Sequence, residues 1–75
     1  MKNELSELLK ELLKRTRNNQ AILEEFEEYY YFKHGEELSN KHRIILYSEL
    51  KYSKEIERNY IQRGNDVVTI YSLKM

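Results

Sequence analysis

Apolar residues recur at helical spacing through the first part of the chain. Five leucines follow the three- and four-residue steps of one helical face: Leu5, Leu8, Leu9, Leu12 and Leu13. Glutamates precede this face and basic residues follow it, an order that the helix dipole favours. The pattern predicts a first helix over about residues 4–17. The pair Asn18-Asn19 leaves open whether the chain breaks there or one long helix continues.

Residues 22–32 divide into two faces under the same period. The apolar face holds Ile22, Leu23, Phe26, Tyr29 and Tyr30. Three consecutive tyrosines turn through roughly 200° of a helix, so Tyr31 falls on the opposite face. The same polar face carries Glu24, Glu27 and Glu28. We predict a second helix over about 20–34, ended by Gly35.

A short connection, residues 35–38, is typical of two antiparallel helices. Ser39 or Asn40 would then cap a third helix over about 40–63, closed by Gly64. This segment carries two apolar stripes, which suits a helix with two neighbours. The alternative is a break near Ser53, with a separate helix over 54–63. The stripes are Ile45, Tyr52, Ile56 and Tyr60, and Leu46, Leu50 and Ile61.

The C-terminal residues 66–75 form a possible strand-forming tail. Their β-branched and aromatic side chains favour an extended conformation. A lone strand leaves its backbone polar groups unpaired, so we expect pairing with another copy or with a partner's sheet edge. The residues expected to pair are Val67, Val68, Thr69, Ile70 and Tyr71.

These elements predict an all-α fold: one domain over residues 1–75, a small bundle of three helices with a short extended tail. Because the apolar faces exceed what one bundle of this size covers, we expect a homodimer or larger assembly. The predicted core is Leu9, Leu12, Leu23, Phe26, Tyr30, Ile45, Leu46, Leu50 and Ile56.

Composition narrows the class of protein. The 75 residues carry a net charge of zero and lack cysteine, which suits a cytoplasmic location. Residues 1–38 hold six bases and nine acids, whereas residues 39–75 hold seven bases and four acids. Without a basic excess, nucleic acid is a less favoured partner than another protein. The sequence contains no apolar run of membrane-spanning length. Abundant Lys, Asn, Ile and Tyr with one alanine indicate AT-rich codons, which fit a low-GC bacterium or a phage, virus or other mobile element.

Catalytic and cofactor motifs are absent from the sequence, so we expect no enzyme and no cofactor. His34 and His42 stand eight residues apart across the expected turn, a spacing that matches no established metal site. We interpret both as surface or helix-end residues and expect no metal. The glutamates of the second helix fan out over its solvated face, where shared catalytic work is not expected.

Residues 53–72 can be aligned with a helix-turn-helix pattern. Its apolar positions are met by Ile56, Tyr60, Val67 and Ile70. Together with residues 38–46, the segment resembles the C-terminal helix-turn-helix of sigma factors and related phage regulators. It departs from that pattern at three positions. The departures are Glu57 for a small residue, Ile61 for the turn glycine and Gln62 for an apolar residue.

We therefore expect a non-enzymatic regulator or inhibitor that acts by protein–protein interaction. Tyrosine is enriched at interface hot spots, and surrounding glutamates favour a partner with a basic surface. The alternative is a helix-turn-helix transcriptional regulator that binds DNA through residues 53–74. The expected partner-binding residues are Tyr31, Phe32, Glu24, Glu27 and Glu28.

Overall fold

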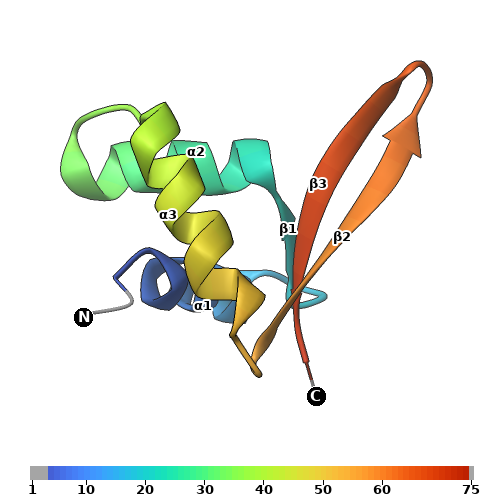
Figure 1. Cartoon of the computed structure of the whole chain (residues 1–75), viewed down its shortest axis with the longest axis horizontal. Coiled ribbons are helices and arrows are strands. Elements are labelled where there is room, and N and C mark those ends of the chain that lie inside the picture. Colours follow the sequence, from blue (N-terminus) through green and yellow to red (C-terminus); the bar gives the residue numbers. More distant parts are fainter. Residues whose placement is uncertain (1–3, 75) are drawn as a thin grey trace.

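The computed structural model describes residues 4–74 and combines three helices with a three-stranded antiparallel sheet (Figure 1). The strand order is β1-β3-β2, so the last strand lies in the middle of the sheet. The predicted all-α class is therefore wrong. The elements are α1 (Glu4–Arg15), β1 (Gln20–Ile22), α2 (Leu23–His34), α3 (Asn40–Lys51), β2 (Ile56–Arg63) and β3 (Asp66–Leu73).

The predicted third helix ends twelve residues early, at Lys51, and residues 56–63 of that segment form strand β2. The break falls at Ser53, whose Oγ accepts hydrogen bonds from the backbone N–H groups of Glu55 and Ile56, each at 3.2 Å. A serine that bonds the backbone two and three residues on competes with helix continuation. The break near Ser53 was correctly anticipated as an alternative, but a strand follows it instead of a helix.

A two-residue turn joins β2 to β3, because Arg63 pairs directly with Asp66. Gly64 has φ +60°, the conformation that the first central residue of a tight hairpin turn requires. The hairpin projects away from the helices (Figure 1). Its first strand, β2, pairs with residues 66–73, for which the sequence pattern predicted no partner strand in this chain.

Residues 67–71 are extended, as predicted, but their predicted pairing with another chain is wrong. Val67, Val68, Thr69, Ile70 and Tyr71 all pair with β2, and the last two also pair with β1. β1 was assigned to the second helix because Ile22 continues the helical spacing of that stretch. Asn19 instead adopts φ +56° and reverses the chain ahead of a three-residue strand. Met75 lies outside the described residues.

The core lies where the three helices meet β1 and β3, with Leu9, Leu13, Phe26 and Leu46 fully buried. Six of the nine predicted core residues are buried, and Leu12 and Leu23 are partly buried against them. The prediction that Ile45 is buried is wrong, because 36% of its surface is exposed. The five leucines on the apolar face of the first helix need no second copy to cover them, because all are buried in the core or packed against it. Self-association stays a prediction. The buried residues outside the predicted core are Leu5, Leu13, Ala21, Leu38 and Tyr71.

Candidate functional site

α2 and α3 form a helix-turn-helix. The five residues between His34 and Asn40 connect them, and α3 crosses α2 steeply (Figure 1). Gly35, at φ +71°, ends α2 by donating its N–H to the Tyr31 carbonyl at 2.8 Å. Buried Leu38 anchors the turn in the core. This pair replaces the helix-turn-helix predicted at residues 53–72, which are instead the hairpin beside it.

Ser39 caps α3 in a reciprocal arrangement. Its Oγ accepts from the His42 backbone N–H at 3.2 Å, and the His42 Nδ1 accepts from the Ser39 N–H at 3.4 Å. The cap fixes where α3 begins and therefore which side chains face outward. Leu46 and Leu50 face the core. The outer side presents Lys41, Ile44, Ser48 and Lys51, all exposed.

The outer side of α3 continues onto the base of the hairpin through Arg58 of β2. The Arg58 guanidinium carbon lies 3.9 Å from the centre of the Tyr47 ring and 5.6 Å from that of Tyr60. Arg58 lowers the pKa of the Tyr47 hydroxyl, first by a side-chain hydrogen bond and second by its charge. We call this the α3–hairpin surface, defined by Lys41, Ile44, Tyr47, Ser48, Lys51, Arg58 and Tyr60.

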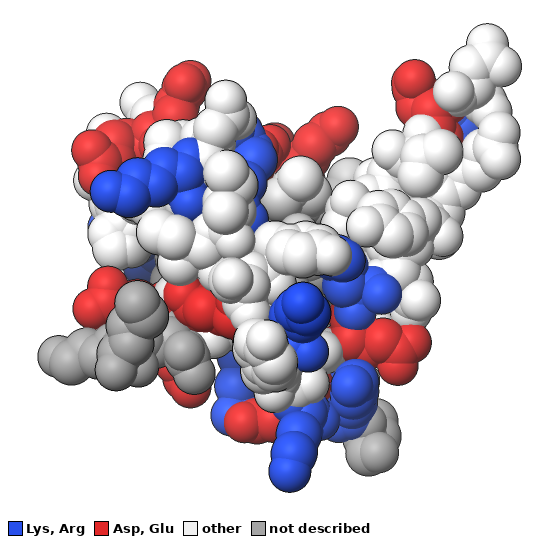
Figure 2. All heavy atoms as spheres, in the orientation of Figure 1, with Lys and Arg blue, Asp and Glu red and all other residues white. Residues whose placement is uncertain are grey.

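Basic side chains lie around the lower end of α3 and the base of the hairpin. Figure 2 looks onto α3 and shows several Lys and Arg there, with Asp and Glu among them, and a further basic group at the upper left. A hollow of about 260 Å³ lies there between α3 and β2. Lys51, Arg58 and Lys74 line it with Tyr47, and Glu57 is its acidic member. The surface therefore combines cations with exposed aromatic rings, as nucleic-acid-binding surfaces do.

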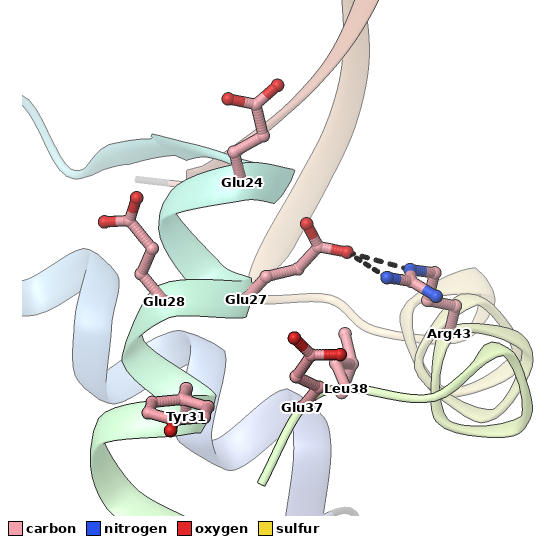
Figure 3. Close-up of a pocket in the computed structure, with 7 residues that line it drawn as sticks. All are labelled: Glu24, Glu27, Glu28, Tyr31, Glu37, Leu38 and Arg43. Carbon is pink, nitrogen blue, oxygen red and sulfur yellow. Dashed lines mark hydrogen bonds and ion pairs between the residues drawn. The ribbon is translucent and has the colours of Figure 1, made fainter.

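A second hollow, of about 430 Å³, lies between α2, the turn and α3 (Figure 3). We call it the acidic groove. Its walls contain four of the five predicted partner-binding residues, and Tyr31 is 56% exposed, as helical phase predicted. Phe32 is exposed but does not line the groove. The lining residues are Glu24, Glu27, Glu28, Tyr31, Glu37, Leu38 and Arg43.

Arg43 spans the acidic groove from the α3 side. Its Nε donates to the Glu27 carboxylate at 2.9 Å, and its Nη2 makes an ion pair with the same oxygen (Figure 3). Its Nη1 donates to the Asn40 Oδ1 at 2.8 Å. Arg43 and Asn40 are thus both engaged within the protein, and Glu27 is the one groove glutamate neutralised in this way among the described residues.

A third hollow, of about 820 Å³ and mainly apolar, lies between α1, α2 and α3. His34 and His42 both line it, and their rings flank that of Tyr30, with centroids 4.6 and 5.4 Å away. Residues 4–74 contain no group of three His, Asp or Glu side chains placed to hold a metal ion. In the same residues, no helix has the length and apolarity needed to cross a membrane.

Sequence reasoning found the acidic groove but missed the α3–hairpin surface. Arg58 and Tyr60 alternate at the two-residue period of a strand, which was the available signal. This strand period was not recognised because Ile56 and Tyr60 are also one helical turn apart and therefore fit a helix. Comparisons with protein-family models, curated proteins and solved structures give no match.

Proposed function

We propose that this protein is a small DNA-binding regulator that places α3 in the major groove of duplex DNA. The observation that carries the proposal is the exposed outer side of α3, which continues onto a projecting hairpin. The major groove is wide enough to admit one helix, and the second helix of a helix-turn-helix is the one that enters it. The layout resembles that of winged-helix DNA-binding domains, a likeness of architecture alone.

The charges on the α3–hairpin surface support a modest number of phosphate contacts. Lys41 and Lys51 are exposed on α3, and Arg58 stands beside them on β2. Glu49, the acid of α3, accepts a hydrogen bond from the Ser6 N–H at 2.9 Å and is thereby held toward α1. Glu24 and Glu28 of α2, which make no ion pair among residues 4–74, line the acidic groove. Phosphates approaching that groove would be repelled, which restricts DNA to the α3 side.

Salt dependence tests this proposal. If Lys41, Lys51 and Arg58 each contact one phosphate, the logarithm of the association constant should fall with log[salt] at a slope of about −3. This applies to a duplex of about 20 base pairs. Fluorescence anisotropy over a salt series measures the slope, with the single strand of the same sequence as the control. No duplex binding at low salt would contradict the proposal. A single strand bound as tightly as the duplex would also contradict a role for α3 in the major groove.

A second candidate function is protein binding through the acidic groove. Its support is that four residues predicted as an interface gather around one hollow, with half-exposed Tyr31 near Glu24 and Glu28, which make no ion pair among residues 4–74. Such a site suits an extended segment rich in Lys or Arg. A DNA-binding regulator with this groove would keep a separate surface for a protein partner, since the groove and the hollow between α3 and β2 share no lining residue.

We expect Tyr31→Ala to weaken binding of a basic partner by about 2 kcal/mol, because tyrosine buries a large area and keeps a polar tip. Its melting temperature should stay near that of the unaltered protein. Phe32→Ala is the matched control, since Phe32 is 78% exposed and lies outside the groove. Calorimetric titration with Arg-rich peptides measures the effect. Equal losses in both variants, or a large drop in stability for Tyr31→Ala, would contradict this candidate.

A further inference from the structure

We propose that Ile44 reads the C5 methyl group of thymine, so that the protein prefers duplex DNA with an A·T pair at the centre of its site. This inference rests on the proposed function. Ile44 is 70% exposed, although it stands at the middle of the outer side of α3. It is surrounded along the helix by exposed Lys41, Ser48 and Lys51.

The asparagine and the arginine of α3 are already engaged within the protein. Asparagine reads adenine and arginine reads guanine, each through a pair of hydrogen bonds. Asn40, however, accepts a hydrogen bond from Arg43, and Arg43 is held by Glu27 of α2. Lysine can contact either guanine or phosphate, and the proposed function uses Lys41 and Lys51 for phosphate. Ile44 is the aliphatic side chain on this exposed side of α3.

Thymine is the base that an apolar side chain distinguishes. In the major groove its methyl group is the apolar feature among hydrogen-bond donors and acceptors. Lys41 and Lys51, exposed on the same side of α3 as Ile44, suit a polyanion as the covering molecule. DNA supplies both features at once: phosphates at the rim and methyl groups inside the groove. A contact between Ile44 and a thymine methyl removes both apolar groups from water.

The neighbouring Ile45 provides a matched control. Both isoleucines line the apolar hollow with Tyr30 and His34, but Ile45 is only 36% exposed, against 70% for Ile44. Ile45→Ala therefore removes the same atoms from the same helix without touching its outer centre. Both variants keep a helix-favouring residue, so α3 should stay intact.

The experiment uses the full chain with three duplexes of about 20 base pairs, two helical turns. The first alternates A and T, the second replaces every T by uracil, and the third alternates G and C. Uracil lacks only the methyl group, and burial of one such group corresponds to about a fourfold change in affinity. We expect the uracil duplex to bind about fourfold more weakly than the thymine duplex. The difference should vanish in Ile44→Ala and persist in Ile45→Ala.

The other outcomes separate this inference from the proposed function. Equal binding of the thymine and uracil duplexes, with a salt slope near −3 for both, would overturn the role of Ile44 and leave DNA binding standing. A methyl effect that survives in Ile44→Ala would also overturn it. Loss of all duplex binding would overturn both proposals. If Ile44→Ala converts a dimer to a monomer in sedimentation, a second copy covers Ile44 and the inference fails.

Discussion

Phe26→Ala is expected to lower the free energy of unfolding by about 3–5 kcal/mol. Phe26 has no exposed area and belongs to the buried cluster that joins α1, α2, α3 and the sheet. Its removal leaves a cavity at a point where several elements meet, and backbone strands on one side limit collapse. A domain of this size holds only about 5–10 kcal/mol in total, so the variant should be close to unfolding at room temperature.

Urea denaturation followed by circular dichroism measures this loss. Phe32→Ala is the control, because it removes the same side chain from the same helix where Phe32 is exposed. Exposed substitutions usually change stability by less than about 0.5 kcal/mol. If both variants unfold at the same urea concentration, Phe26 is not the centre of the core.

Helical spacing located the helices of this fold but not the strands. The leucines of α1 and the aromatic face of α2 fix those helices because each covers three turns with a consistent period. Gly35 and Ser39 mark the ends of the connection through local chemistry that a sequence displays directly. Those interpretations needed no knowledge of distant residues.

The strands depend on contacts that the sequence does not display. β1 has three residues, too few for any period to emerge, and exists because β3 offers Ile70 and Tyr71 to pair with it. In β2, Ile56 and Tyr60 fit a helix and a strand equally well. The deciding residues were Ser53 and Gly64, which end α3 and turn the hairpin. Because no second strand was predicted, the C-terminal strand was expected to pair with another chain.

The two candidate sites also differ in how far the sequence alone predicts them. The acidic groove could be predicted because Glu24, Glu28 and Tyr31 share one helix, where spacing alone sets their relative positions. The α3–hairpin surface joins Tyr47 to Arg58, eleven residues later and on a different element. Only the hairpin brings them together. Besides the alternation of Arg58 and Tyr60, the basic second half of the chain was a feature of this surface visible in the sequence.

Replacing Lys51 and Arg58 together by glutamate is expected to weaken duplex DNA binding by about 100-fold or more. Each hydrogen bond between a charged side chain and phosphate contributes about 1.5–3 kcal/mol, and 1.4 kcal/mol is tenfold in affinity. The reversed charges would also repel the phosphates that the native side chains attract. Fold should be retained, because Lys51 is exposed and Arg58 lies over the exposed ring of Tyr47.

The matched control is Lys14→Glu with Arg17→Glu, which makes the same change in net charge elsewhere. Lys14 lines a hollow beside α1, and Arg17 lines another next to β1, both apart from the α3–hairpin surface. Anisotropy at fixed low salt compares the pairs, with a melting curve to verify folding. Equal losses of DNA affinity in the two double variants would mean that binding depends on net charge and not on this surface. Arg58→Lys separates charge from stacking: it keeps the phosphate contact but loses the planar group over Tyr47, so an intermediate loss is expected.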